Sequence, residues 1–598
     1  MSQNAATTET GLARETQPSS DGRVWAYAAV IAAVTIWAYG NSFRVPFLFD
    51  DTPSIPKNAT IRQIWPLSGP LTPPVISSTY GRPLLNLSFA VNYAVSERSV
   101  FGYHAVNLCI HILAALTLFG IVRRTLQRPA LAGRFGNAAV PLAGAIALLW
   151  AVHPLQTMAV TYIVQRAESM AALFFLLTLY ALLRGATGGR AWAWYAAAWA
   201  ACLAAAFTKE TMAPLPVVAL LYDRTFLAGS FRGALRRRWA VYLLLAACWA
   251  PLGWLIHSAG GRNDTAGFAI GVTAWQYALT EAGVILHYLR LAFWPDVLVL
   301  DYGWPLASWP GAALPAAVVV AMLAATAWAL WRKPAAGFLA AWFFLTLAVT
   351  SSVVPIKDPA FEQRMYLALA GVVALVVMGA WVLLRALPSR LPAAVPIAAA
   401  ALAALTLAAR THARNYDYRT AEAIWRTVVE SRPQNARARN NLGNALADTE
   451  KFPQAVEQFR EAIRLQPDFA DAHYDLGNAL YKLGRKEGRL EEAVEEYKDA
   501  LRIKPKDADA LGNLSLVLVD LKRYDEAIEC CRKVLQIRPK SADAHYIWGT
   551  VLERQGKYSA AVEQFQEVLL LKPRNDKARE SLLRVQGRLQ RGGGTFRP

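Results

Sequence analysis

Residues 365–385, MYLALAGVVALVVMGAWVLLR, carry no charged side chain before the final arginine. A helix of roughly 20 such residues is about 30 Å long, which matches the hydrocarbon core of a bilayer. The 598-residue chain as a whole is 55% apolar and only 18% charged, a balance that soluble domains rarely show. The sequence therefore predicts a protein that crosses a membrane several times.

Eleven apolar stretches fit membrane-crossing helices in length and composition. They are residues 24–41, 101–122, 139–153, 169–183, 191–207, 211–223, 239–258, 311–331, 336–354, 365–385 and 392–409. Two more helical stretches, 83–95 and 273–294, are shorter or more polar, and we expect them to lie along the membrane interface. If 273–294 crosses the membrane instead, the orientation of everything after it is inverted.

Basic residues between the apolar stretches indicate the orientation of the chain. They cluster at residues 123–134, 184–190, 224–238, 332–333 and 385–390, which all face the cytoplasm if the N-terminus does. Eleven crossings then place everything after Ala409 on the non-cytoplasmic side. The net charge of +19 is thus explained by topology, and no recognition module for nucleic acid accompanies it.

Five prolines mark a repeat in the C-terminal part of the chain. Pro433, Pro467, Pro505, Pro539 and Pro573 are separated by 34, 38, 34 and 34 residues, and 34 is the tetratricopeptide (TPR) period. Helix pairs of this kind stack into an α-solenoid with a concave groove. The expected fold class is therefore all-α, a transmembrane helix bundle followed by a TPR solenoid.

This organisation divides the chain into five expected parts. They are a cytoplasmic tail (1–23), a transmembrane domain (24–410), a linker with an atypical opening half-repeat (411–433), four repeats (434–573), and a C-terminal capping helix and tail (574–598). Polar side chains on the first helices of the repeats are candidates to hold an extended acceptor peptide. They are Arg439, Asn440, Asn444, His473, Asn478, Asn513 and His545, which also fit simple solvated helix faces.

Two adjacent carboxylates, Asp50 and Asp51, follow the first apolar stretch. Carboxylates beside an apolar segment at a membrane interface are partly desolvated, which raises the pKa of at least one of them and suits a general base. The alternative is a solvated loop in which the pair caps a short helix. Which of the two would act as the base is left open.

Other ionisable groups are expected on the same face of the membrane, at the ends of apolar stretches. The candidates for binding a donor phosphate are Arg82, Arg166, Lys209 and Arg364, and the supporting candidates are His153, Glu168, Glu210, Glu362 and Tyr366. Cations there would bind a lipid phosphate that carries a sugar, while a carboxylate takes the proton of a hydroxyl acceptor. Each group taken alone also fits an interfacial anchor.

Several motifs resemble one known family. They are Phe49-Asp50-Asp51, Tyr80-Gly81-Arg82-Pro83-Leu84, Tyr103-His104-Ala105-Val106-Asn107-Leu108, His153-Pro154, Arg166-Ala167-Glu168, Lys209-Glu210, Glu362-Gln363-Arg364-Met365-Tyr366-Leu367 and Glu422-Ala423-Ile424-Trp425-Arg426. Together they resemble the transmembrane and tetratricopeptide-repeat-containing (TMTC) protein O-mannosyltransferases, from about residue 24 to 573 and in the same domain order.

The resemblance implies a membrane-embedded glycosyltransferase of the C type, with the aspartate pair as its catalytic feature. Such an enzyme moves mannose from a polyprenyl-phosphate donor to serine or threonine hydroxyls of proteins on the non-cytoplasmic side. The chain departs from the family pattern at Met158 and Glu168, where the family often has glutamate and aspartate. The short N-terminal tail and compact repeats suit a prokaryotic member, in an inner membrane and with periplasmic or extracellular repeats.

Two other classes of protein remain open alternatives. An envelope oligosaccharide ligase or polymerase should carry its key residues in a large late outer loop, whereas the late loop 355–364 is short. A non-catalytic membrane-anchored scaffold for protein assembly has no use for charged groups gathered on one face. No cofactor is expected, none of the five cysteines has metal-ligand spacing, and a divalent metal at the aspartates is left open.

Overall fold

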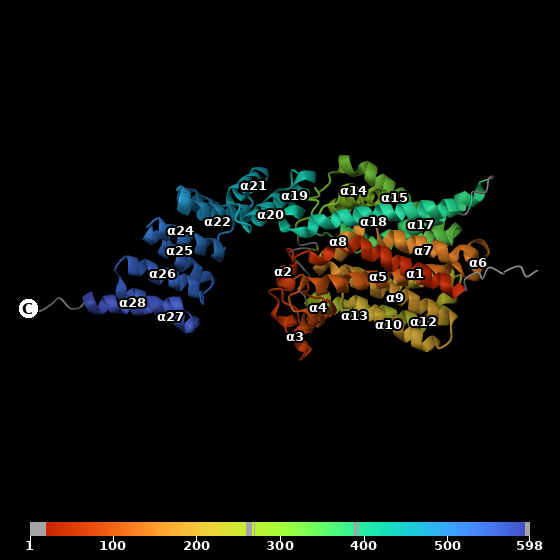
Figure 1. The fold of residues 1–598 in the computed structure, drawn as a ribbon, viewed down its shortest axis with the longest axis horizontal. Helices are drawn as coiled ribbons and strands as arrows, with labels where there is room; N and C mark the ends of the chain where they lie inside the picture. The colour runs from red at the N-terminus through yellow and green to blue at the C-terminus, as the bar shows by residue number, and fades with distance from the viewer. Residues whose placement is uncertain (1–19, 259–265, 268–269, 388–391, 393, 593–598) are drawn as a thin grey trace, which may run out of the picture. The chain divides into compact units, whose positions relative to one another are not determined.

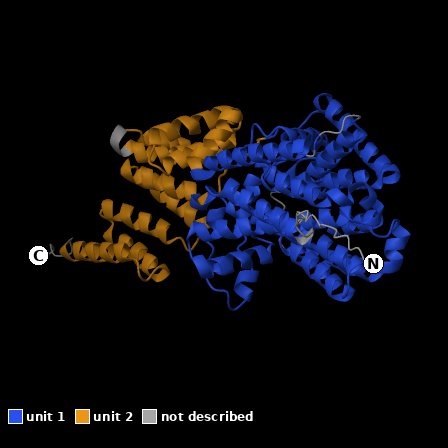
Figure 2. Ribbon diagram, turned by 45° about the vertical axis from the view of Figure 1, so that its right-hand side comes forward, with its two compact units in different colours: residues 1–300, 304–420 blue, residues 301–303, 421–598 orange. Residues whose placement is uncertain are grey.

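The computed structural model describes residues 20–258, 266–267, 270–387, 392 and 394–592 (Figure 1). Within these ranges the chain forms helices and no β-strand, so the predicted all-α class is confirmed. The chain divides into two compact units, one of residues up to 300 with 304–420 and one of residues 301–303 with 421–598 (Figure 2). Residues 1–19 of the expected N-terminal tail, 388–390 of a basic cluster and 593–598 of the expected C-terminal tail lie outside the described residues.

The first unit contains the long apolar helices. Its helices are α1 (Ser20–Tyr39), α2 (Asp51–Ser54), α3 (Ser68–Leu71), α4 (Pro83–Ser96), α5 (Val100–Leu126), α6 (Pro129–Phe135), α7 (Ala139–Ala151), α8 (Thr157–Thr161), α9 (Arg166–Thr187), α10 (Ala191–Ala206), α11 (Leu215–Phe226), α12 (Phe231–Ala247), α13 (Trp249–Ser258), α14 (Ala274–Phe293), α15 (Trp309–Arg332), α16 (Pro334–Leu347), α17 (Met365–Ala386) and α18 (Ala394–Asn415). Helix α5 packs against α7 and α9, and α9 packs against α10.

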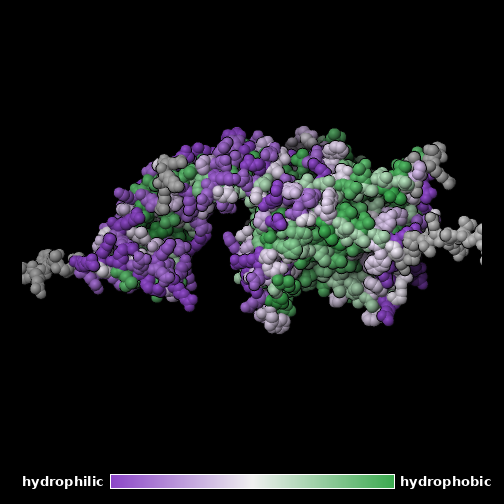
Figure 3. All heavy atoms as spheres, in the orientation of Figure 1, coloured by the Kyte–Doolittle hydropathy of each residue, from purple (hydrophilic) through white to green (hydrophobic). Residues whose placement is uncertain are grey.

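Eight helical segments among the described residues are long and apolar enough to cross a membrane. They are Gly22–Tyr39, Val100–Leu126, Pro129–Ala151, Ile163–Thr187, Phe231–Ser258, Trp309–Arg332, Glu362–Ala386 and Ala394–Arg419. Large apolar side chains face outward on these helices and produce the green surface in Figure 3. An apolar surface of this extent is the lipid-facing belt of a membrane protein, because in water it would drive association.

Three of the eleven expected crossings are shorter than a span in the structure. The ranges 191–207, 211–223 and 336–354 correspond to α10, α11 and α16, which have 16, 12 and 14 residues. Pro214 precedes α11 and sets its start, whereas α16 starts at Pro334 and is short because it ends at Leu347, before the end of the expected range. The ranges 83–95 and 273–294, which we did not count as crossings, form α4 and α14, and neither is among the eight.

The loops that carry the candidate site meet at one end of the first unit, which we call the site end. Here the loop after α1 bonds to the segment before α9, Leu84 N–H donates to Phe207 O at 3.2 Å, and Tyr288 Oη donates to Phe361 O at 3.0 Å. In Figure 1 the short helices α2 and α3 lie at this end, and α6 lies at the other.

Basic side chains gather at the other end of the first unit, which we call the basic end. Arg124, in the last turn of α5, lies over the Tyr180 ring of α9, and Arg224 at the end of α11 donates to Leu330 O of α15 at 2.8 Å. Arg238 pairs with the buried carboxylate of Asp223 through two hydrogen bonds of 2.6 and 2.7 Å. Ends of helices rich in arginine are typical of the cytoplasmic side.

The last turn of α18 belongs to the first unit. Asn415 is buried and bonds to three elements: it donates to Ala38 O at 3.0 Å and to Asn41 at 2.9 Å, and it accepts from Thr161 at 2.7 Å. Thr411 donates to Val152 O at 2.7 Å, and the Tyr418 ring after the helix is fully buried. The first unit therefore extends to Thr420, whereas the sequence-based division places its end at residue 410.

The second unit is a stack of helix pairs. Its helices are α19 (Ala421–Ser431), α20 (Ala436–Ala447), α21 (Phe452–Leu465), α22 (Ala470–Glu487), α23 (Leu490–Ile503), α24 (Ala508–Asp520), α25 (Tyr524–Ile537), α26 (Ala542–Arg554), α27 (Tyr558–Leu571) and α28 (Asp576–Gly592). Glycine is required where the helices of a pair touch, because a Cβ at Gly443 would lie 2.5 Å from the Phe459 ring. The four extra residues of the second repeat lengthen α22, which ends at Gly488 with φ +75°.

A truncation distinguishes the two boundaries of the first unit. A chain ending at Thr420 should keep this unit folded, whereas a chain ending at Arg410 loses the buried Asn415 and Tyr418 and should be destabilised by at least about 3 kcal/mol. Thermal unfolding in detergent, followed by circular dichroism, measures the difference. Equal melting temperatures for the two chains would contradict this boundary.

Candidate active site

The loop after α1 makes a tight turn that separates the two aspartates. Asp51 N–H donates to Leu48 O at 2.8 Å and Thr52 N–H donates to Phe49 O at 3.0 Å. Phe49 has φ +40°, which lies in a backbone region that residues other than glycine adopt only under strain. Its ring packs edge-on against Tyr162, with centroids 6.5 Å apart. Tertiary packing therefore maintains a turn that its own residues do not favour.

Asp51 is fully buried and acts as a structural clamp. Its Oδ2 accepts from Leu48 N–H at 2.9 Å and its Oδ1 accepts from Val164 N–H at 2.7 Å. Burial raises the pKa of Asp51 to about 8, and the two backbone hydrogen bonds only partly oppose this. With a hydrogen bond on each oxygen and no exposed surface, Asp51 joins the loop after α1 to the segment before α9 and is not accessible to a substrate.

Asp50 is exposed and has the opposite environment. Its backbone N–H donates to Tyr162 Oη at 3.0 Å, which leaves the carboxylate free of backbone partners. Desolvation raises the pKa of Asp50, while the Ser78 hydroxyl and the Arg82 guanidinium pull it down. The carboxylate keeps contact with water, so desolvation affects it less than Asp51. The structure thus gives the two aspartates different roles, Asp51 as a buried clamp and Asp50 as an accessible carboxylate. The sequence alone could not distinguish them, because they are adjacent and identical.

Tyr162 is a site residue that the sequence analysis missed. Its side chain is buried, its hydroxyl accepts from Asp50 N–H, and its ring supports Phe49. It lies in the sequence between His153 and Arg166, two candidates already placed at this face. Its position between these two candidates was the feature of the sequence that could have identified Tyr162 as a site residue.

Arg166, expected to bind a donor phosphate, is instead committed to the protein. Its guanidinium is fully buried, lies 4.7 Å from the Phe89 ring centroid, and donates to Asn107 at 2.6 Å and Asn92 at 2.7 Å. A further donor bonds to Tyr103 O at 3.0 Å. These acceptors are neutral, so the buried cation is stabilised by hydrogen bonds to uncharged groups and by its contact with the Phe89 ring. In this conformation Arg166 offers no donor to a ligand.

Arg82 lies near Asp50, and Lys209 lies near Arg82 and Glu210, so that the charges alternate. Arg82 binds Glu210 through bonds of 3.0 and 3.3 Å and donates to Ser78 O at 3.0 Å. Lys209 forms an ion pair with Glu168, and both side chains are buried. Desolvation lowers the pKa of Lys209, opposed by Glu168 and assisted by Arg82. The Arg82 side chain is 12% exposed and the Glu210 side chain is 26% exposed, so an incoming anion could replace Glu210 as the partner of Arg82.

The remaining candidates lie in separate contacts that tie elements together. Arg364 donates to Asp358 O at 2.6 Å and lies 3.9 Å from Glu281. Glu362 accepts from Val299 N–H, and Tyr366 Oη bonds to His111 at 2.7 Å. His153 Nε2 bonds to Ala292 O at 3.1 Å, and burial lowers the pKa of this histidine to about 4, which keeps it neutral. No contact of these four side chains among the described residues reaches the aspartates.

The expected groove residues of the repeats bond to one another across neighbouring helices. Asn440 and Asn444 of α20 both donate to Asp475 of α22, at 2.9 and 2.8 Å. Asn513 of α24 donates to Asn478 of α22 at 2.7 Å. We call these cross-repeat bonds the polar ladder. The other expected groove residues bond within a single repeat: Arg439 to Gln458 at 3.1 Å, His473 to Glu496 at 2.7 Å and His545 to Gln564 at 2.9 Å.

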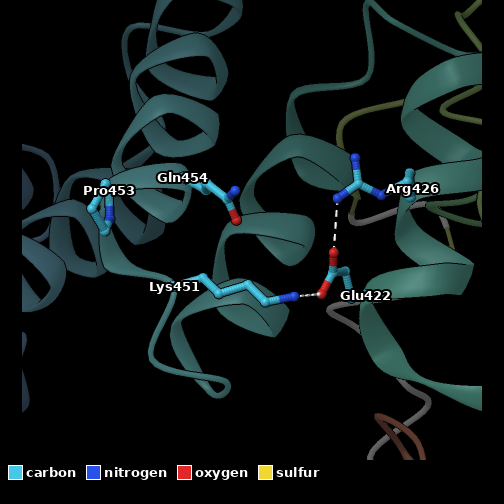
Figure 4. A pocket seen from close by; sticks show the side chains of 5 residues that line it. All are labelled: Glu422, Arg426, Lys451, Pro453 and Gln454. Carbon is cyan, nitrogen blue, oxygen red and sulfur yellow. Dashed lines mark hydrogen bonds and ion pairs between the residues drawn. The ribbon is translucent and has the colours of Figure 1, made fainter.

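A pocket at the start of the second unit is lined by Glu422, Arg426, Lys451, Pro453 and Gln454 (Figure 4). Glu422 accepts from Arg426 at 2.8 Å and from Lys451 at 2.7 Å. Exposed ion pairs of this kind contribute at most about 1 kcal/mol each. The single carboxylate is shared by two cations, and we assign the pocket no catalytic role.

The residues that could hold a metal ion lie in the repeats. Among the described residues, ligand atoms of His473, Glu496 and Asp499 all lie within 4.8 Å of one another, and no such group of three includes Asp50 or Asp51. His473 Nε2 bonds to Pro467 O at 3.0 Å and its Nδ1 already bonds to Glu496. A proton shared between the imidazole and the carboxylate satisfies this contact without a metal.

Comparisons with known proteins identify both parts of the chain. Family models described as TPR repeat or tetratricopeptide repeat match residues 443–484, 485–547, 542–575 and 406–451. Protein O-mannosyl-transferase Tmtc3 of Drosophila melanogaster is 27% identical over 532 residues, which cover 76% of this chain and 57% of the relative. Protein O-mannosyl-transferase TMTC1 of Homo sapiens is 26% identical over 515 residues, covering 75% and 56%. A crystal structure of MamA is 25% identical, covers 28% of this chain and 94% of that chain, and has a TM-score of 0.25.

The curated relatives are longer than this chain, which spans little more than half of their length. Their similarity nevertheless extends far beyond the repeats, because it covers about three quarters of the chain, whereas the repeat models begin at residue 406. Over about three quarters of its length the chain is therefore similar to the TMTC protein O-mannosyl-transferases, and it combines an apolar helical unit with tetratricopeptide repeats.

Proposed function

We propose that the protein is a membrane-embedded glycosyltransferase that moves a sugar, with mannose favoured by the names of its relatives, from a polyprenyl-phosphate donor to serine or threonine hydroxyls of proteins. The observation that carries this proposal is the divided aspartate pair, since an open carboxylate stands near the Arg82 guanidinium, with Lys209 next to Arg82, at one end of a membrane bundle. The similarity to the O-mannosyl-transferases supports the reaction class.

Asp50 is the general base of the proposed reaction. A hydroxyl is a weak nucleophile at neutral pH, so its proton must leave as its oxygen bonds to the anomeric carbon. The proton moves to the Asp50 carboxylate, the bond between the anomeric carbon and the phosphate oxygen breaks, and its electron pair leaves with the phosphate. Asp51 does not take part in this transfer. It positions Asp50 by holding the turn.

Arg82 and Lys209 are the proposed ligands of the donor phosphate. Negative charge grows on the phosphate as the bond to the sugar breaks, and cations fixed nearby stabilise that charge. Arg82 is the better placed of the two, because its guanidinium is partly open and presents two parallel donors. Glu210 occupies those donors in the free protein, and phosphate would replace it.

The proposed orientation puts the site end and the repeats on the non-cytoplasmic side. The arginines of the basic end support a cytoplasmic position for that end. We further propose that the repeats bind the acceptor protein, and that the membrane is the inner membrane of a prokaryote with an undecaprenyl-type carrier. Because the polar ladder uses many groove side chains, an acceptor would bind the groove by displacing these bonds or by contacting what they leave open.

Substitutions at the two aspartates should have different effects. Asp50→Asn removes the base and should reduce sugar transfer at least about a hundredfold with an unchanged melting temperature. Asp51→Asn places an NH2 group against a backbone N–H and should destabilise the first unit by roughly 1–3 kcal/mol. Transfer to a purified acceptor protein and thermal unfolding measure the two effects, with Asp468→Asn on an exposed turn of the repeats as control. Full activity of Asp50→Asn would reject the proposed base.

The pH dependence of transfer reports the ionisation of Asp50. Only the ionised carboxylate accepts a proton, so kcat/KM should fall tenfold per unit as pH drops below the pKa of Asp50, and that pKa is raised by desolvation. Arg82 lowers this pKa, so in Arg82→Gln the acid limb should move to higher pH. A limb that stays in place or moves to lower pH in this variant would show that another group titrates.

Loss of the Arg82 guanidinium should weaken donor use. Arg82→Gln removes two charge-assisted hydrogen bonds to the phosphate, and we expect kcat/KM for the lipid donor to fall roughly 10–150-fold. Arg82→Lys keeps the charge but not the fork, and should recover only part of the loss. Arg290→Gln is the control, because Arg290 pairs with Asp296 in an exposed contact. Equal kinetics for the Arg82 and Arg290 variants would exclude Arg82 as a phosphate ligand.

A further inference from the structure

The loop between α2 and α4 contains a long stretch without charge. Residues 63–81 include no aspartate, glutamate, lysine, arginine or histidine. We call residues 63–77, which contain α3, the apolar loop. Loops in water are normally polar, so a charge-free stretch of this length needs a physical reason.

The apolar loop exposes its large side chains rather than burying them. Trp65, Val75 and Ile76 retain 76%, 71% and 86% of their surface, and Ile64, Leu67 and Leu71 are also exposed. Burial of one such side chain is worth roughly 1.5–3 kcal/mol. A loop that collapsed onto the protein would gain most of this energy at Trp65, Val75 and Ile76, and this loop forgoes it at these three side chains.

Buried polar groups hold the apolar loop in this exposed position. Asn86 of α4 is fully buried and donates to Pro70 O at 2.8 Å and to Thr60 at 2.9 Å, and it accepts from Asn58 at 2.8 Å. Arg62, at the start of the loop, lies 4.3 Å from the Tyr93 ring centroid and donates to Ile55 O at 3.1 Å. The exposure is thus built into the fold.

The exposed surface continues onto the helices beside the loop. Val91 and Val95 of α4 are 49% and 83% exposed, and Phe101 at the start of α5 is 60% exposed. In Figure 3 the green surface of the first unit extends to the region where Figure 1 labels α3. Both ends of the loop return to the site end, next to helices that cross the membrane.

We infer that the apolar loop inserts into the lipid leaflet at the site end, with Trp65, Val75 and Ile76 among the acyl chains and glycerol groups. Tryptophan and aliphatic side chains without neighbouring charge are suited to this depth, and the nearest basic residues, Arg62 and Arg82, stand at the two ends of the charge-free stretch. A protein partner would instead favour a rim with charged residues around the apolar centre, and the loop has no charged residue.

The insertion has a consequence that rests on the proposed function. The loop returns through Ser78 and Arg82, which both contact the Asp50 site. A loop fixed in the leaflet sets the height of Asp50 and Arg82 relative to the headgroups, where the phosphate of a polyprenyl donor lies. The apolar loop is therefore a positioning element for the lipid donor.

Depth-dependent quenching tests the insertion without any assay of activity. In a Cys109→Ser background the other four cysteines are buried, so a single NBD label can be placed at Ile76→Cys or, as control, at the exposed Lys57→Cys. In nanodiscs, doxyl-labelled phosphatidylcholine should quench the Ile76 label at least threefold more than the Lys57 label, and aqueous iodide should show the reverse order. Quenching of both labels by iodide alone, or shielding of Ile76 only when acceptor protein is added, would overturn the inference.

Kinetics test the positioning role separately. The double variant Trp65→Asp with Ile76→Asp should raise KM for a long-chain polyprenyl-phosphate sugar in vesicles at least tenfold with little change in kcat, and should not affect a short-chain soluble donor. Trp65→Phe with Ile76→Leu keeps the apolar surface and should behave as the wild type. Unchanged KM in the aspartate variant, with the label still in lipid, would reject the positioning role. Absence of all transferase activity would reject the proposed function and leave the quenching result intact.

Discussion

One buried carboxylate connects the parts of the first unit on which the candidate site depends. Asp51 accepts hydrogen bonds from the backbone N–H groups of Leu48 and Val164. Val164 lies 113 residues further along the chain. A buried N–H without an acceptor is costly, so loss of this one side chain would leave two such groups in separate loops. The turn at Phe49, the position of Tyr162 and the exposure of Asp50 all follow from this clamp.

The site illustrates how neighbouring groups of the same type acquire different chemistry. Asp51 is surrounded by protein and donors, whereas Asp50 faces water and the Arg82 guanidinium. The cations also divide: Arg166 is buried on neutral acceptors, while Arg82 and Lys209 pair with the carboxylates of Glu210 and Glu168. Environment rather than residue type decides which group can meet a substrate, as expected where burial and charge move pKa values apart.

The architecture could be predicted because it depends on local patterns. Runs of apolar residues and a 34-residue proline spacing are visible along the sequence, and α17 and the repeats appear where these patterns place them. The roles of the individual residues in the site could not be predicted from the sequence, because they depend on contacts between distant segments. Arg166 looks like a free cation in the sequence, and only the approach of Asn92 and Asn107 shows that its donors are taken. The same reason explains why Tyr162 was missed.

The polar ladder limits how freely the repeats can be rearranged. Asp475 accepts amide hydrogens from the preceding repeat, and Asn478 accepts one from the following repeat. A repeat that forms these bonds needs a neighbouring repeat that supplies the matching amide or carboxylate. Deletion, duplication or exchange of single repeats would therefore leave unmatched polar groups at the new junction, so the repeats of this array are not interchangeable modules.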